Sequence, residues 1–417
     1  MPQRFSPADY IKITILGFAL TALWSSLHSI VLPLRLLDFV AESEKNTYLG
    51  LLTFSGLILA MLAQPIAGAF SDRSSFRWGR RRPYILLGTM AAMLFLPGIG
   101  LFHSYAAVFV FYCLMQISSN TAQGPYQAFI PDLAPQERRG VASGVKTLFE
   151  ILGGIALARL IGYLMGKYFG GEGEVWLWLS LTTLAIVLLG AMAATILTVK
   201  EPAGAGGIRL PSPSILYRTF KIDVKLNQDF VWFLVSRLFI LMAFATLQTF
   251  ALYFLKDVVG VENPATVTAD LLIATGAGML VAVYPAGRLS DRIGRKPIAV
   301  TSGLLGALAI AVLFFLHSYA YILACGVLLG IASGAFLSSN WALATDLVPK
   351  GEEARYLGLA NMATAGGGAA ARLIGPVIDF FENPAHPGQG YSIMFLGCFI
   401  YFILGSLLML KIKGKKQ

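Results

Sequence analysis

Apolar runs long enough to cross a lipid bilayer follow one another along almost the whole of this 417-residue chain, separated by short charged turns. A spanning helix needs about 20 consecutive apolar residues. Twelve runs of that kind lie between breakers: Ile11–Phe39, Tyr48–Phe70, Pro83–Phe102, Ala107–Leu133, Gly140–Tyr168, Val175–Val199, Phe230–Leu255, Thr266–Leu289, Ile298–Leu316, Ala320–Leu347, Ala354–Phe381 and Tyr391–Leu410. We therefore predict an all-α integral membrane protein with twelve transmembrane helices.

The composition supports this class and argues against others. The chain is 56% hydrophobic and only 13% charged, whereas soluble domains are about 25% charged. The net charge of +10 does not indicate a nucleic-acid partner, because the basic residues are confined to particular turns. The first apolar run is too long for a signal peptide, so we interpret it as a membrane helix. Three cysteines lie inside apolar runs without metal spacing, which predicts no metal and no cofactor.

The distribution of Lys and Arg predicts the orientation in the membrane. Basic residues gather in alternate turns, within residues 73–82, 138–139, 200–225, 288–296 and 411–416, while the other turns hold few of them. Cytoplasmic loops carry the excess of positive charge in membrane proteins. We expect a multi-pass protein of the cell membrane with both termini in the cytoplasm.

The second half of the sequence repeats the first. Pro297 follows Pro83 by 214 positions, and the same offset relates two His-Ser-Tyr segments, beginning at His103 and His317, and the Asp-Leu-x-Pro segments beginning at Asp132 and Asp346. Such a constant offset indicates duplication. We predict a six-helix half over residues 1–200, a cytoplasmic linker over 201–228, where Gly, Pro and Ser accumulate, and a second six-helix half over 229–417.

Two charged turns suggest a family. The sequence Gly-x-x-x-Asp-Arg begins at Gly68 after the second predicted helix and at Gly287 after the eighth. Two six-helix halves with these turns resemble the major facilitator superfamily, over essentially the whole chain. Within it, segments 77–88 and 120–125 are similar to the glycoside–pentoside–hexuronide:cation symporters and their sucrose-transporter relatives. The resemblance implies a transporter that opens alternately to the two sides of the membrane.

The resemblance also implies an ionic latch at the cytoplasmic side that must break for inward opening. The residues that match this role lie in the two charged turns and at the ends of the fourth and tenth helices. They are Asp72, Arg73, Arg81 and Asp132 in the first half, and Asp291, Arg292, Arg295 and Asp346 in the second. The alternative is that the arginines only set the topology or contact lipid headgroups.

Polar residues inside the apolar runs are candidates for substrate binding, because polar groups at membrane depth tend to face the bundle interior. The fourth helix carries Gln116, Asn120, Gln123 and Gln127 on one face, and the first carries Thr21, Ser25, His28 and Arg35, with Trp24 beside them. Such groups suit a sugar, although hydrogen bonds between helices are the alternative. Further candidates are Gln248, Asn340, Trp341 and Asn361; Arg237 shares a face with Gln248 but lies nearer the cytoplasmic end.

Glu150 is the acid expected nearest the middle of the bilayer, and Lys146 precedes it by one turn. Burial raises the pKa of a carboxyl group and a neighbouring cation lowers it, so such a pair can load and release a proton. We hypothesise that Glu150 and Lys146 couple transport to protons; the alternative is a static ion pair. The second helix contains no acid, which departs from melibiose-type sodium symporters and argues against sodium coupling there.

The leading hypothesis is proton-coupled symport of a small-molecule sugar or glycoside by a monomer in the lipid bilayer. The runner-up is a proton-coupled exporter of amphipathic drugs or lipids, because the Asp-Arg turn also occurs in drug antiporters. A uniporter and a sensor on the same fold stay open. An enzyme has little support, because no nucleophile–base pair, metal cluster or phosphate loop is evident in the sequence.

Overall fold

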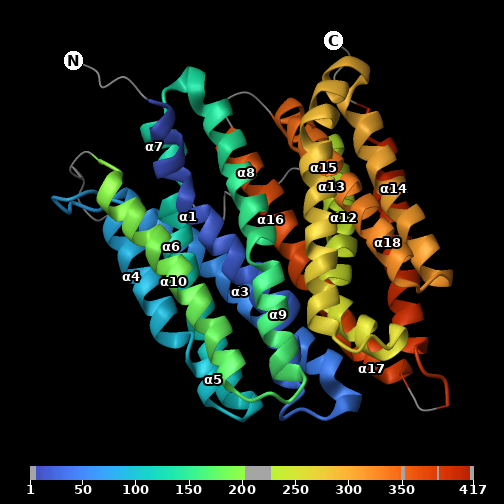
Figure 1. Ribbon diagram of the computed structural model, residues 1–417. Helices are drawn as coiled ribbons and strands as arrows, with labels where there is room; N and C mark the ends of the chain where they lie inside the picture. The colour runs from blue at the N-terminus through green and yellow to red at the C-terminus, as the bar shows by residue number, and fades with distance from the viewer. Residues whose placement is uncertain (1–5, 202–226, 349–352, 383–384, 414–417) are drawn as a thin grey trace. The chain divides into compact units, whose positions relative to one another are not determined.

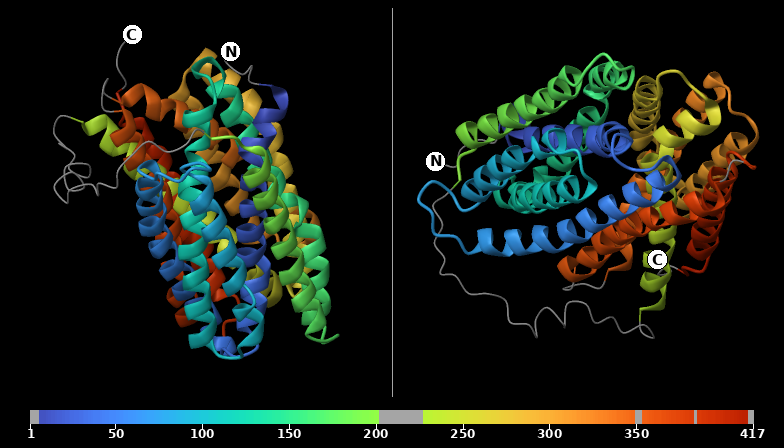
Figure 2. Two further views of the ribbon diagram at one scale, coloured as in Figure 1. Left: turned by 90° about the vertical axis from the view of Figure 1, so that its left-hand side faces the viewer. Right: turned by 90° about the horizontal axis from the view of Figure 1, so that it is seen from below.

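The computed structural model describes residues 6–201, 227–348, 353–382 and 385–413 (Figure 1). Most of the predicted linker over 201–228, and the last part of the basic tail, lie outside these residues. The chain forms two compact units: the first comprises Met1–Val40 and Ser55–Ser212, and the second comprises Ala41–Phe54 and Pro213–Gln417. Within each unit the long helices run side by side (Figure 2).

The first unit is built from six helical segments, several of them interrupted. In chain order its elements are α1 (Pro7–Ser26), the π-helical turn η1 (Leu27–Val31) and α2 (Leu32–Leu36); α3 (Lys45–Asp72); α4 (Arg82–Phe95) and α5 (Gly98–Leu101); α6 (Tyr105–Gln127) and α7 (Phe129–Leu133); η3 (Gln136–Arg138), α8 (Arg139–Ala156) and α9 (Ala158–Phe169); and α10 (Val175–Thr198).

The second unit also contains Ala41–Phe54, which form the short helix η2 (Glu42–Glu44) and the first part of α3. Its other elements are α12 (Gln228–Phe254) and η4 (Leu255–Val259); α13 (Pro264–Ile293); α14 (Arg295–Phe315); α15 (Tyr319–Leu347); α16 (Glu353–Ala371), η5 (Arg372–Ile374) and α17 (Gly375–Phe381); and α18 (Gln389–Leu410).

The described helices group into twelve segments, as the apolar runs predict, and ten of them are long and apolar enough to cross a membrane by length and composition. The other two are 105–133, whose α6 carries the predicted polar stripe, and 353–381, which is rich in Gly and Ala. Large apolar side chains, among them Leu94 and Phe315, are exposed on the helix surfaces. Lipid tails would cover such side chains.

The duplication seen in the sequence is also present in the packing. In the first unit α1 packs against α8 and α10, and in the second α12 packs against α16 and α18. Corresponding glycines permit the first of these contacts: a Cβ on Gly153 would lie 2.1 Å from the carbonyl oxygen of Phe18, and one on Gly367 would lie 2.7 Å from that of Leu238. Small residues let membrane helices approach closely. Corresponding helices therefore meet in the same way in the two units.

Candidate functional site

A connected group of polar and aromatic side chains joins α1–η1 to α6 in the first unit. Nε2 of His28 lies 2.9 Å from the hydroxyl of Tyr112, and the same hydroxyl accepts a hydrogen bond of 2.8 Å from the amide of Gln116. The amide of Asn120 donates to Oε1 of Gln116 at 3.2 Å. The indole of Trp24 lies over His28, with ring centroids 5.1 Å apart. We call these five residues the α1–α6 cluster.

Local structure explains why these side chains meet. His28 lies in the π-helical turn η1, where the extra residue per turn changes the direction of the side chains relative to α1. Pro33 follows and has no amide hydrogen for a regular helical bond. On the facing helix α3, a Cβ on Gly56 would lie 2.3 Å from the ring of Tyr112. Glycine at this position therefore leaves the space that Tyr112 occupies.

The members of the cluster differ in their access to solvent. Gln116 is 2% exposed and Asn120 is 5% exposed, so both amides form the buried part of the cluster, where they bond to each other. Trp24 and His28 are partly exposed, and the indole of Trp24 also donates to the hydroxyl of Ser119 at 3.0 Å. In this conformation the indole and the imidazole are the groups that a ligand can reach first.

The remaining predicted residues of the two polar stripes have separate positions. Gln123 is partly exposed and makes no hydrogen bond within the described part of the chain. Ser25 donates weakly, at 3.4 Å, to the carbonyl of Gly154 on α8. Gln127 accepts from Gln64 of α3 at 2.8 Å. Arg35, expected on the same face as His28, is 1% exposed and donates to backbone carbonyls at the C-terminal end of α5 and of the residue that follows it.

Lys146 and Glu150 form the predicted ion pair on α8, with 2.7 Å between Nζ and Oε1. Both side chains are partly exposed, and Glu150 lies close to Gly17 of α1. The two side chains therefore lie on one face of α8, one helical turn apart.

Two of the residues predicted for the second unit, Asn340 and Trp341, contact a buried arginine. Arg237 of α12 is 3% exposed; its Nε donates to the hydroxyl of Thr364 at 2.9 Å and its Nη1 donates to Oδ1 of Asn340. The Trp341 ring centroid lies 5.7 Å from its guanidinium carbon. We call these four residues the Arg237 cluster. The other two candidates, Gln248 on α12 and Asn361 on α16, are exposed.

The charged turns form ion pairs within each unit. In the first, Asp132 accepts from Arg80 at 2.7 Å and from Arg81 at 3.0 Å, and Arg81 also pairs with Asp72. Arg73 makes no ion pair within the described residues. Arg81 is only 3% exposed and additionally donates to Ser71.

In the second unit Arg295 pairs with Asp346 at 2.6 Å and lies 4.0 Å from Asp291. Arg292 is exposed and forms no ion pair in the part of the chain that the structure describes. The two copies therefore keep the same Arg–Asp pairing, and the second has fewer contacts.

Sequence reasoning missed Glu201, which holds the first charged turn in place. Its carboxylate accepts from the backbone amides of Arg81 at 2.9 Å and Arg82 at 3.4 Å, at the start of α4. Gly79, at φ +123°, passes so close that a Cβ would lie 2.2 Å from this carboxylate. Burial raises the pKa of the Glu201 carboxyl, although these amide bonds and the nearby arginines oppose the shift.

Sequence reasoning also missed a network at the start of α3, within the second unit. Lys45 is buried and pairs with Glu42 and Asp257, at 2.7 Å each. The carboxylate of Asp379 accepts from the amide of the Asn46 side chain at 2.8 Å and from the backbone of Thr47 at 2.6 Å. Asp379 thus caps the N-terminus of α3 with a negative charge, which the positive end of the helix dipole favours. We call these groups the Lys45 network.

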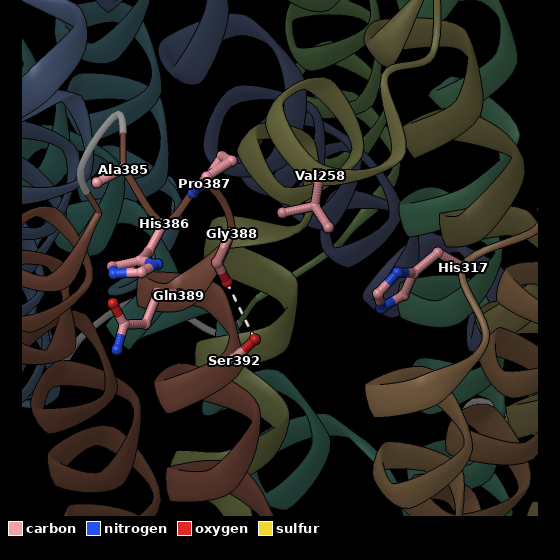
Figure 3. Close-up of a pocket in the computed structure, with 8 residues that line it drawn as sticks. All are labelled: Val258, His317, Ala385, His386, Pro387, Gly388, Gln389 and Ser392. Carbon is pink, nitrogen blue, oxygen red and sulfur yellow. Dashed lines mark hydrogen bonds between the residues drawn. The ribbon is translucent and has the colours of Figure 1, made fainter.

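An open hollow of about 530 Å³ lies at the loop before α18. Figure 3 shows His317 and His386 on opposite sides of it, with Val258 between them. Its lining residues are Val258, His317, Ala385, His386, Pro387, Gly388, Gln389 and Ser392. None of the residues that the sequence predicted for substrate or coupling lines this hollow.

Comparison with known proteins identifies the family. A model of the MFS/sugar transport protein family matches residues 16–356. The chain belongs to the MFS/sugar transport protein family. This assignment confirms the predicted superfamily and fold class, and it makes the protein a membrane transporter rather than an enzyme.

Curated relatives of this family member include plant sucrose transporters. The sucrose transport protein SUT1 of Oryza sativa subsp. japonica is 29% identical over 134 residues, 27% of this chain and 24% of that protein. The minor myo-inositol transporter IolF of Bacillus subtilis is 29% identical over 103 residues, 25% of this chain and 24% of that protein. The chain thus matches about a quarter of the length of these relatives.

Solved structures share the fold of this family member along nearly its whole length. A D-xylose-proton symporter superposes with a TM-score of 0.75 at 18% identity, covering 99% of this chain and 100% of that one. The nucleoside transporter NupG gives a TM-score of 0.75 at 14% identity, covering 98% of this chain and 99% of that one. At these identities the likeness establishes the fold alone.

Proposed function

We propose that this family member carries a sugar or glycoside into the cell together with a proton, by alternating access. The observation that supports the substrate class best is the α1–α6 cluster. An indole, an imidazole, a phenol and two carboxamides are brought together on membrane helices without a formal negative charge among them. Such groups donate and accept hydrogen bonds to hydroxyls, and an aromatic face covers the apolar side of a sugar ring.

The pair of Lys146 and Glu150 supports proton coupling. A partly exposed carboxylate 2.7 Å from a lysine can be protonated when water or substrate changes the surroundings of the pair. Loss of the charge on Glu150 would release Lys146 and weaken the link between two turns of α8. In this proposal the monomer lies in the cell membrane with both termini in the cytoplasm, as the positive-inside rule predicts.

Groups at the two ends of α3, together with Arg295 of α14, form the gates of the proposal. Asp72 at its C-terminal end pairs with Arg81, and the Lys45 network holds its N-terminal end. In the proposed cycle the Arg81 and Arg295 pairs close the cytoplasmic side, and the Lys45 network closes the opposite side. Each set breaks when its own side opens.

The experiment is uptake into proteoliposomes, with a panel of glycosides under an imposed proton gradient or an imposed sodium gradient. Accumulation driven by the proton gradient alone is the expected result. Glu150→Gln should abolish accumulation but leave exchange of labelled for unlabelled sugar intact, because binding and rocking do not need the proton. Glu172→Gln is the matched control, since it breaks another Lys–Glu pair of the first unit, at the end of α9.

Several outcomes would contradict the proposal. Full accumulation by Glu150→Gln removes this residue from coupling. Accumulation with sodium alone replaces the proton. Expulsion of a dye or lipid without any response to sugars would favour an exporter.

A further inference from the structure

Arg237 is a buried charge with neutral partners. It lies nine residues beyond the start of α12, about 14 Å along a helix that rises 1.5 Å per residue, so it is well inside the membrane-spanning segment. Its contacts within the described residues are a hydroxyl from α16, an amide oxygen from α15 and an aromatic ring. No carboxylate lies within ion-pair distance of it in the described part of the chain.

This arrangement is costly for a protein that only needs to hold three helices together. An uncompensated charge in a low-dielectric interior is strongly unfavourable, whereas a neutral pair can tie helices at much lower cost. Guanidinium has five N–H donors, and the hydroxyl of Thr364 and the amide oxygen of Asn340 use two of them. The remaining donors need an acceptor that the described residues do not provide.

A second group at the same place is also incomplete. Asn340 is 0% exposed, and its Nδ2 is buried without a hydrogen-bond partner among the described residues. Its Oδ1 is the atom that receives Arg237, so the amide nitrogen cannot be exchanged with the oxygen without placing two donors against each other. Next to Arg237 there is therefore a neutral donor that also lacks an acceptor.

We propose that Arg237, with Asn340, recognises a negatively charged group on the transported sugar, a carboxylate or a phosphate. The planar fork of an arginine matches either group through two parallel hydrogen bonds. The indole of Trp341, 40% exposed beside the guanidinium, offers an apolar face to the attached ring. Arg237 is in this view the specificity-determining residue that separates acidic sugars from neutral ones. The inference rests on the proposed function, because it names the substrate class of the proposed transporter.

Binding to the purified full-length protein in detergent tests the inference without requiring transport. The probes are 4-nitrophenyl β-glucuronide and 4-nitrophenyl β-glucoside, which differ only in carrying a carboxylate or a hydroxymethyl group, and glucose 6-phosphate against glucose. The wild type should bind one acidic probe at least about tenfold more tightly than its neutral match, because a hydrogen bond between two charged groups is stronger than one to a neutral hydroxyl. Which acidic probe shows the preference distinguishes carboxylate from phosphate.

Three variants isolate the role of Arg237. Arg237→Met should bind acidic and neutral probes alike, and Arg237→Lys should keep part of the preference because it keeps the charge. Arg288→Met is the matched control: it removes one positive charge from an exposed position on α13 and should keep the wild-type preference. If Arg237→Met does not fold, the wild-type preference and Arg237→Lys still decide.

The outcomes separate this inference from the proposed function. Equal wild-type binding of acidic and neutral sugars overturns the role of Arg237 while sugar binding stands. If Arg237→Met weakens the binding of acidic and neutral sugars equally, Arg237 only holds the helices together, and its role in specificity is overturned. If no sugar binds, the proposed function fails. Thermal stabilisation of the wild type by acetate or inorganic phosphate, lost in Arg237→Met, would then still support an anion site at Arg237. If neither anion stabilises the wild type, the anion site is overturned as well.

Discussion

Two arginines buried in the two units are held in opposite ways. Arg35 in the first unit donates to the carbonyl oxygens of Ile99, Gly100 and Phe102, at 3.0–3.1 Å, and pairs with Asp38 at 2.7 Å. Arg237 in the second unit has neutral partners and no carboxylate among the described residues. The exposed fractions are nearly equal, 1% and 3%. The comparison teaches that burial alone does not reveal what a charge in a membrane bundle does.

The difference lies in what surrounds each guanidinium. The partners of Arg35 include carbonyls at the C-terminal end of α5. These oxygens receive no hydrogen bond from an amide within the helix, and they carry partial negative charge. Its charge is therefore compensated by the fold itself. Arg237 lacks such compensation and is best explained by a partner that arrives with the substrate.

The largest predicted effect is the loss of stability on Arg35→Met. Removing the guanidinium leaves buried carbonyls without their donor and Asp38 without its cation, which should lower the free energy of unfolding by about 3–5 kcal/mol. Unfolding of the detergent-solubilised protein, followed by circular dichroism or thermal shift, measures it. Arg237→Met should cost much less, because it also removes an uncompensated charge. If the two variants lose equal stability, the distinction between the two arginines is broken.

A smaller effect is expected from Tyr112→Phe in the α1–α6 cluster. The variant removes the hydroxyl that contacts both His28 and Gln116, and a lost buried hydrogen bond costs about 1–3 kcal/mol. We expect sugar binding to weaken about tenfold, equally for acidic and neutral sugars, because this cluster has no fixed charge. Isothermal titration against the same matched probes measures it, with the exposed Tyr284→Phe on α13 as control. A selective loss for acidic sugars would contradict the division of roles between the units.

The smallest effect concerns Glu201, a carboxylate held mainly by backbone amides. Its pKa is raised above the ordinary 4.5 by burial, so the folded state binds the proton more tightly than the unfolded chain. The stability that this proton contributes is present below pH 4.5 and is lost as the pH rises through the raised value. The wild type minus Glu201→Gln difference in thermal midpoint should therefore fall with increasing pH. A difference that rises with pH would mean that the charged carboxylate is the stabilising form.

The sequence was sufficient for the features that depend on composition, repetition and local spacing. The twelve segments, the duplicated charged turns and the pairing of Lys146 with Glu150 follow from them and recur in the structure. The contact of His28 with Gln116 of the fourth helix follows the general expectation that polar groups gather inside membrane bundles. These features need little knowledge of how distant segments meet.

The features that were missed depend on backbone atoms or on long-range contacts. The polar stripe of the first helix predicts Arg35 beside the substrate residues, but backbone carbonyls at the C-terminal end of α5 hold it instead, and backbone carbonyls have no sequence signature. The capping of Thr47 by Asp379 joins residues 332 positions apart. The importance of Arg237 is hidden in the sequence, because its position along α12 does not show that α15 and α16 bury it.

The division of α3 between the two units has a mechanical consequence. Residues up to Phe54 are anchored in one body and residues from Ser55 in the other, along one continuous helix of 28 residues. Because α3 is continuous, any change that separates its two parts requires either that the contacts of its N-terminal part break or that the helix bends. Pro65 lies within this helix and removes one of its backbone hydrogen bonds. A rearrangement of this helix is therefore expected to occur either at the ion pairs of the Lys45 network or at the backbone around Pro65.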